Sequence, residues 1–255
     1  MNRNIIILTI FSLVIIVFGI LLTTYGIIKL SNLAVEKEFS STLLEDQFDL
    51  FIYTPPAYSL QYKQSYPVLY LLDGNHYFLE RKEERRTKWS MQKTIDRLIK
   101  EKRLPSIIVV GITPVNKRGE YYLPNQYGGQ LEAFVPFITD ELKAYIDTKY
   151  RTKREAEHTG IMGAGLGGLA SLHIGSIAPD VFGKVGALGP VKEETEAPMT
   201  TEELLKEMER VQADSFALDD QHKQVVHLMT NQLLNASETD LDQQLEKMLL
   251  SLFGQ

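Results

Sequence analysis

Cysteine is absent from this chain of 255 residues. Its absence excludes disulfide bonds, a thiol nucleophile, zinc sites built on cysteine and attachment to lipid through a cysteine. Spacings typical of metal ligands are missing too, so we predict no metal site. Basic residues are not in excess, because the formal net charge is −6, and we predict no nucleic-acid partner.

Charged residues are also missing from one long stretch near the N-terminus, residues 5–28, which Arg3 and Lys29 bound. A bilayer span needs about 20 apolar residues, whereas the apolar core of a cleaved signal has only about 7–15. The length favours an uncleaved anchor over a signal peptide. The positive-inside rule then favours a single-pass protein of the cell membrane with an extracytoplasmic soluble domain.

The next part of the chain, up to Pro190, alternates apolar runs with amphipathic segments. The runs are apolar without alternation, which is typical of strands buried on both faces of a parallel sheet. Repeated strand–helix units indicate an open sheet with helices on both faces. We predict strands at 48–53, 66–72, 107–112, 161–163 and 185–188, and helices at 89–102, 131–150 and 166–178.

The remainder of the chain is more acidic than the part before it, because residues 191–255 hold 14 acidic and 5 basic residues. Their pattern predicts helices only. Thr200 to Glu203 reads as a capping box before the first helix. A second helix covers the apolar residues between Val225 and Leu234, and a third runs from Leu241 to Leu252. The strand at 185–188 would then lie at an edge of the sheet, and either that edge or the helices could bind a protein partner.

Several segments in a fixed order carry a family resemblance: "YPVLYLLDGNHYF", "LPSIIVVGI", "FITDELKAYIDTKYRT" and "GIMGAGLGGLASL". The chain from Glu38 to Pro190 resembles the putative esterases of the α/β-hydrolase fold, which include esterase D, enterochelin esterase and the mycolyltransferases. The resemblance implies a serine hydrolase or acyltransferase scaffold. We therefore divide the chain into a transmembrane anchor (1–30), an α/β-hydrolase-like domain (31–190) and an acidic helical segment (191–255) that replaces the C-terminal strands.

The family's nucleophile stands at the apex of a Gly-x-Ser-x-Gly turn between a strand and a helix. In this chain the turn runs from Gly163 to Gly167, and its apex is Gly165. Without a hydroxyl oxygen no acyl-enzyme can form there. The same glycines match a dinucleotide motif, but no acidic residue follows in the window 184–191, so we predict no cofactor.

The catalytic acid and histidine normally follow this turn, at the ends of two later strands. No such strand is predicted after Leu188. The nearest pattern is Asp219 or Asp220 with His222 or His227, and these residues are too close in sequence to end successive parallel strands. We interpret both histidines as packing or surface residues and assign no catalytic residue.

The resemblance assigns the oxyanion hole to the backbone N–H of Leu166 and to the loop at Gly74 and Asn75. Asp73 and His76 then lie near the pocket. Two hypotheses remain open. The first is a membrane-anchored pseudo-hydrolase with a binding or scaffolding role, and the second is an active ester hydrolase or acyltransferase with an unorthodox site at Asp73, His76 or a partner's residue.

Overall fold

The computed structural model describes residues 3–28, 30–78, 91–190, 199–217, 224–229 and 238–254. Three residues of the acid–histidine pattern, Asp219, Asp220 and His222, lie outside these ranges.

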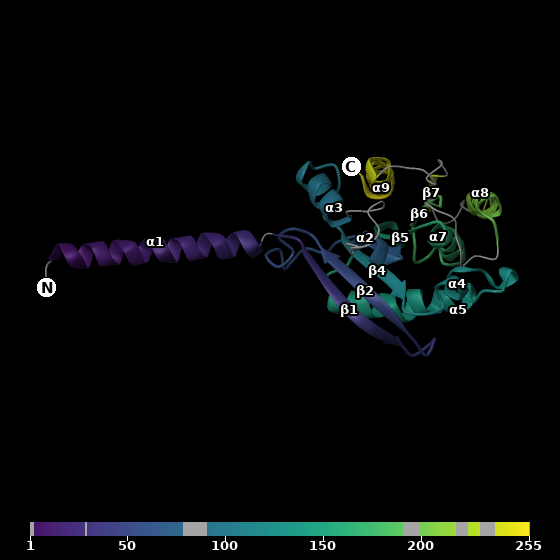
Figure 1. The fold of residues 1–255 in the computed structure, drawn as a ribbon, viewed down its shortest axis with the longest axis horizontal. Helices are drawn as coiled ribbons and strands as arrows, with labels where there is room; N and C mark the ends of the chain where they lie inside the picture. Colours follow the sequence, from purple (N-terminus) through teal and green to yellow (C-terminus); the bar gives the residue numbers. More distant parts are fainter. Residues whose placement is uncertain are drawn as a thin grey trace.

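The first helix, α1 (Arg3–Ile28), extends away from the rest of the chain (Figure 1). Large apolar side chains between Ile10 and Leu22 are exposed along it. Within the described part of the chain, no helix combines the length and apolarity needed to cross a bilayer. The predicted transmembrane helix is therefore not confirmed.

The described strands form one seven-stranded sheet in the order β1-β2-β4-β3-β5-β6-β7. β1 and β2 are antiparallel to each other, and β2 is antiparallel to β4. All remaining neighbours are parallel. The strands are β1 (Asn32–Ser41), β2 (Asp46–Thr54), β3 (Val68–Leu72), β4 (Ile108–Pro114), β5 (Thr159–Ala164), β6 (Lys184–Leu188) and β7 (Val225–Met229).

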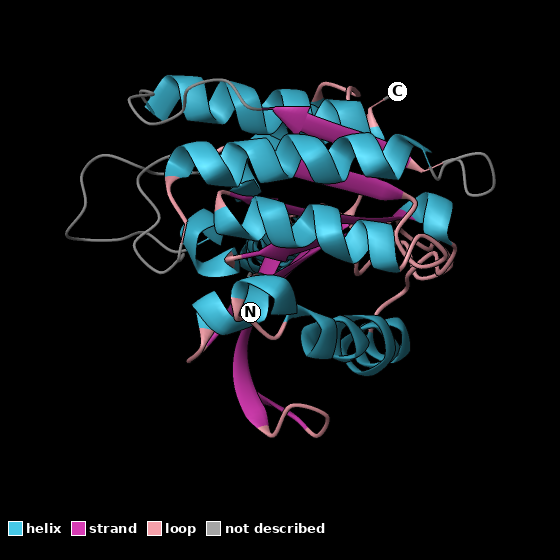
Figure 2. Ribbon diagram, turned by 90° about the vertical axis from the view of Figure 1, so that its right-hand side faces the viewer, coloured by secondary structure: helices cyan, strands magenta, loops and turns pink. Residues whose placement is uncertain are grey.

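Helices cover both faces of the sheet (Figure 2), as predicted. Alternate residues of β3 enter different cores: Tyr70 packs with the helices of one face, and Leu71 packs with α3 and α9 on the other. The helical elements are α2 (Gly74–Phe78), α3 (Met91–Lys100), α4 (Arg118–Tyr122), η1 (Asn125–Tyr127), α5 (Leu131–Pro136), η2 (Phe137–Leu142), α6 (Lys143–Lys149), η3 (Ala156–His158), α7 (Leu166–Ile177), α8 (Thr201–Ala217) and α9 (Glu238–Phe253).

The predicted helix at 131–150 is observed as α5, η2 and α6 in direct succession. Pro136 ends α5, and the six residues of η2 that follow have the wider π-helical turn. Proline has no N–H to donate to the preceding turn, so a change of helical geometry at this point is expected.

The prediction of helices only after Pro190 is wrong at residues 225–229, which form β7. This strand runs parallel to β6, with Lys184 opposite Val225 and Leu188 opposite Met229. A short apolar run cannot be assigned to helix or strand by periodicity alone, and its two valines favour a strand. The edge of the described sheet is therefore β7 and not β6.

Candidate functional site

The turn between β5 and α7 has the sharp backbone geometry of a nucleophile elbow. Gly165 stands at its apex with φ 56° and ψ −125°. Its N–H donates to the carbonyl of Leu188 at 2.9 Å, and its carbonyl accepts from the N–H of Leu169 at 3.0 Å. A residue with a Cβ in this region of φ/ψ space costs of order 1–3 kcal/mol, which glycine avoids. The apex therefore has the elbow's backbone and no side chain.

The glycines beside the apex are explained by close packing of α7 on the sheet. A Cβ on Gly163 would lie 2.3 Å from the carbonyl oxygen of Gly167. A Cβ on Gly168 would lie 2.8 Å from the carbonyl oxygen of Leu188. Packing alone therefore explains these glycines. A bound nucleotide is not needed to account for them.

Asp73 directly follows β3 and lies beside the elbow. Its Oδ2 atom is 3.2 Å from the position of a Cβ on Gly167, at the first turn of α7. Arg118 binds both carboxylate oxygens, through Nε to Oδ1 and Nη2 to Oδ2, each at 2.8 Å. The Asp73 side chain is only 5% exposed. A carboxylate held in this way accepts two charge-assisted hydrogen bonds, and it is not free to act as a general base.

Tyr122 completes the surroundings of this ion pair. Its hydroxyl oxygen accepts the N–H of Asp73 at 3.2 Å, and its ring lies 5.4 Å from the Arg118 guanidinium. Burial raises the pKa of Tyr122 well above its usual range, with a further contribution from Asp73. The phenol is therefore neutral and has a positioning role beside the pair.

The loop expected to supply part of an oxyanion hole is already engaged. The N–H of Asn75 donates to the hydroxyl of Thr113 at 3.0 Å. Gly74 packs against β4 so closely that its Cβ would lie 2.5 Å from the Cα of Gly111. Leu166 is the first residue of α7, directly after the apex. Of these predicted positions, Leu166 and Asp73 lie at the elbow. The N–H of Asn75 is used in the hydrogen bond to Thr113 of β4.

The described histidines are scattered. His158 precedes β5, at the opposite end of that strand from Gly165. His173 lies within α7, and its Nε2 is 3.6 Å from the Glu207 carboxylate. His227 lies within β7, and burial lowers its pKa. His76 lies on α2, which directly follows β3. Because β3 runs parallel to β5, His76 lies at the same end of the sheet as the elbow.

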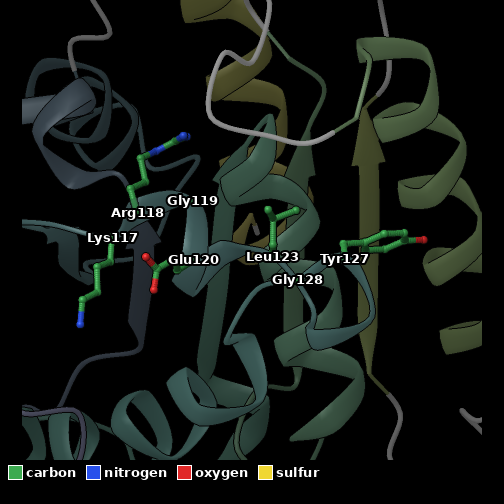
Figure 3. Close-up of a pocket in the computed structure, with 7 residues that line it drawn as sticks. All are labelled: Lys117, Arg118, Gly119, Glu120, Leu123, Tyr127 and Gly128. Carbon is green, nitrogen blue, oxygen red and sulfur yellow. The ribbon is translucent and has the colours of Figure 1, made fainter.

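Two of the cavities lined by described residues lie near α4 and α8. The larger has a volume of about 520 Å³, and Arg118 and Lys117 extend from its lining in different directions (Figure 3). The second, of about 400 Å³, lies along α8 and shares Tyr127 with the first. The first is lined by Lys117, Arg118, Gly119, Glu120, Leu123, Tyr127 and Gly128, and the second by Tyr127, Met199, Glu203, Lys206, Glu207 and Arg210.

Glu207 lines the second cavity and connects α8 to the rest of the domain. Its carboxylate accepts hydrogen bonds from Arg210 at 2.6 and 2.8 Å and from Gln126 at 3.4 Å. Hydrogen bonding to Arg210 lowers the pKa of Glu207, despite its burial. Helix α8 is therefore tied to α7 and η1 by Glu207.

Arg118 and Glu207 were both missed in the sequence. The available signal for Arg118 was topological, because α4 follows β4 and therefore lies at the same end of the sheet as Asp73 and Gly165. For Glu207 the helical spacing places it on α8 but does not indicate its partners. Among the described residues, no group of three or more histidine or acidic side chains could hold a metal ion.

A seven-stranded, mostly parallel sheet with helices on both faces and an elbow after β5 defines an α/β-hydrolase-like protein. The model of the family described as "Putative esterase" matches residues 41–248, and the chain belongs to this family. It is 28% identical over 147 residues to the uncharacterized protein YbbA of Bacillus subtilis, covering 54% of each chain. It is also 28% identical over 152 residues to the uncharacterized protein YjcH of the same organism, covering 59% of this chain and 58% of YjcH.

Solved structures show the same fold at low sequence identity. An IroE-like serine hydrolase from Shewanella oneidensis superposes with a TM-score of 0.63 at 19% identity, covering 87% of this chain and 80% of the hydrolase. A ferulic acid esterase gives 0.60 at 17% identity, covering 88% and 98%. The enterobactin esterase FES from Shigella flexneri gives 0.61 at 14% identity, covering 87% and 58%. The likeness to these structures concerns the fold alone.

Proposed function

We propose that this member of the esterase family is a membrane-associated pseudo-hydrolase with a binding or scaffolding role. One observation carries the proposal. The apex of the elbow, where the resemblance places the nucleophile, is Gly165 with the backbone angles of an elbow. Glycine offers no oxygen to attack an ester carbonyl, so the acyl-enzyme route is closed at this position.

The surroundings of the apex support the same proposal. Arg118 binds both oxygens of the Asp73 carboxylate, so the acid beside the elbow is committed to an ion pair. Among the described histidines, His173 and His227 lie within a helix and a strand, and not after a strand end at the elbow. The positions of His173 and His227 support the proposal, because the base of a triad lies within hydrogen-bond reach of the nucleophile.

The first test is labelling with a fluorophosphonate probe, together with assays on short acyl esters. We expect the wild type to remain unlabelled and inactive. Gly165→Ser restores the hydroxyl, and Gly165→Ala is the matched control that adds a Cβ alone. We expect both variants to be inactive, because serine alone has no base to activate it.

Labelling of the wild type would overturn the proposal in favour of an active ester hydrolase or acyltransferase with an unorthodox site. Asp73→Asn and His76→Gln would then locate that site, because loss of labelling in one of them would identify the residue involved. Activity of Gly165→Ser but not Gly165→Ala would show instead that a base and an acid are present.

The binding role is assigned to the larger cavity, where Arg118 and Tyr127 line a space of about 520 Å³ near the elbow. A concave space lined by both polar and apolar side chains suits a small ligand with a polar group. The test is a rise in melting temperature with short carboxylates and esters. We expect Tyr127→Ala to lose the rise and Tyr62→Ala, in an unrelated loop, to keep it. Equal responses in both variants would exclude this cavity.

Membrane association is assigned to residues 5–28. The absence of charge from this stretch and the exposed large apolar side chains between Ile10 and Leu22 support the assignment. The soluble part would lie outside the cytoplasm. Fractionation with a carbonate wash tests the association, and proteolysis of intact cells tests the orientation. Recovery of the whole chain in the soluble fraction would contradict both.

A protein partner stays a proposal as well. It would bind through α8 and α9 or through the sheet edge, which is now β7 among the described strands. Cross-linking from an introduced cysteine at Leu228 would test the edge, because the chain has no cysteine of its own.

A further inference from the structure

The parallel strands begin at one end of the sheet, opposite the elbow. Val68 of β3 pairs with Ile108 and with Thr159, the first residues of β4 and β5. β1 starts at this end too, because Asn32 pairs with Thr54 at the end of the antiparallel strand β2. Helix α1 therefore meets the domain at the end where the parallel strands begin, whereas Gly165 lies where they finish.

Ser31, which directly precedes β1, is fixed to the domain. The hydroxyl of Ser31 donates to Asp96 of α3 at 2.7 Å and accepts from Gln92 at 3.0 Å. Asp96 also accepts from the hydroxyl of Tyr53, at the end of β2, at 2.7 Å. The point where the apolar helix meets the domain therefore has a defined position relative to the sheet.

Exposed apolar side chains lie at this end of the sheet. Leu30, before β1, is 67% exposed, and Tyr62 is 71% exposed in the loop between β2 and β3. Leu60 in the same loop is also exposed, and the loop lies at this end because it leads from the end of β2 to the start of β3. Tyrosine is enriched at the membrane–water interface.

Basic residues lie at the same end of the sheet. The segments that precede the parallel strands, residues 59–65, 101–106, 151–158 and 179–184, contain seven basic and four acidic residues in a chain with a net charge of −6. Helices α8 and α9 have the opposite balance, with nine acidic and three basic residues between them. The basic residues are Lys63, Lys102, Arg103, Arg151, Lys153, Arg154 and Lys184.

We infer that this strand-entry face, defined by Leu30, Leu60, Tyr62 and the seven basic residues above, rests on anionic lipid headgroups. The inference rests on the proposed membrane association of residues 5–28. Cations close to an anionic surface are attracted within a Debye length, and the apolar side chains enter the interface beside them. The elbow and its cavities then face away from the bilayer, toward the aqueous phase.

The absence of cysteine permits a clean test on the full chain. An environment-sensitive fluorophore is attached to Tyr62→Cys on the strand-entry face. The matched control is Leu43→Cys, 55% exposed at the turn between β1 and β2. Both proteins are reconstituted in vesicles of neutral phosphatidylcholine alone or with phosphatidylglycerol. Lipid-borne quenchers then report contact with the membrane.

We expect quenching at residue 62 to rise about twofold from neutral to anionic vesicles and to fall back in 1 M salt, where the Debye length is only about 3 Å. Quenching at residue 43 stays unchanged. Lys63→Gln with Lys102→Gln removes most of the rise. The matched pair Lys206→Gln with Lys247→Gln, on the acidic helices, keeps it.

Two failures are distinguishable. If the full chain binds neither kind of vesicle, the proposed membrane association fails, and this inference fails with it. If the chain binds but residues 62 and 43 are quenched equally, or both charge variants behave alike, the inference is overturned while the association stands.

Discussion

Arg118 and Asp73 form a bidentate ion pair, with two contacts of 2.8 Å, beside the glycine at the apex of the elbow. The pair joins α4 to the end of β3, and the Tyr122 hydroxyl accepts the backbone N–H of Asp73. A buried pair of this kind contributes little net stability relative to apolar residues, but removal of one partner is costly. It fixes the geometry of the loops around the elbow, whether or not chemistry occurs there.

Replacement of Arg118 by alanine is expected to lower the free energy of unfolding by about 3 kcal/mol, because the Asp73 carboxylate is left buried without its cation. Urea denaturation measures the change. The control is Arg97→Ala, which removes exposed ion pairs with Glu101 and Glu246 and should cost under about 1 kcal/mol. Equal losses in the two variants would show that the Asp73 pair has no special role.

Substitution of Gly165 by alanine is expected to destabilise the fold by about 1–3 kcal/mol, since φ of 56° strains any residue with a Cβ. Ala133→Ser, at an exposed position on α5, is the control and should stay within about 0.5 kcal/mol. A neutral effect at Gly165 would mean that the turn relaxes to another conformation when it acquires a side chain.

The fold was predictable where the sequence pattern was strong. The apolar runs that form β3 and β4 do not alternate with polar residues, which is typical of strands buried on both faces of a parallel sheet, and the glycine spacing around Gly165 indicates a tight turn. The antiparallel strand β1 was missed. Its sequence, NLAVEKEFSS, is mostly polar, and a register shift between Glu36 and Phe39 breaks its alternation.

The candidate site was less predictable, because its contacts join segments far apart in the sequence. Arg118 meets Asp73 across 45 positions, and Glu207 meets Gln126 across 81. No local pattern marks such pairs. β7 was missed for a different reason, since VVHLM is short and apolar enough to suit a buried helix as well.

The capping box at the start of α8 is a local signal that the structure confirms. The Thr200 hydroxyl accepts the N–H of Glu203 at 3.3 Å, and the Glu203 carboxylate accepts the N–H of Thr200 at 2.7 Å. Thr200→Ala should cost about 1 kcal/mol, because one donor of the first turn loses its partner. Denaturation measures it, with Thr148→Ala, exposed on α6, as the control. A loss no larger than that of the control would contradict the role of the cap.

His173 is expected to make stability depend on pH. Burial lowers its pKa below 6.5, and this effect exceeds the opposing attraction of Glu207 on α8 and Glu132 on α5, while Arg210 on α8 adds to the lowering. The unfolded chain therefore binds more protons than the folded chain as pH falls through the unfolded value. The free energy of unfolding must then decrease as pH falls from about 7 toward the lowered pKa.

Urea denaturation between pH 7.5 and 5 tests this dependence. We expect His173→Gln to flatten the decline, because the residue that titrates differently in the two states is gone. Some decline persists, since burial lowers the pKa of His227 as well. His158→Gln, on η3 at the far end of β5, is the control and should keep the slope of the wild type. A His173 variant with the full slope of the wild type would show that the folded and unfolded chains bind this proton equally, in which case the attraction of Glu207 offsets the desolvation between α7 and α8.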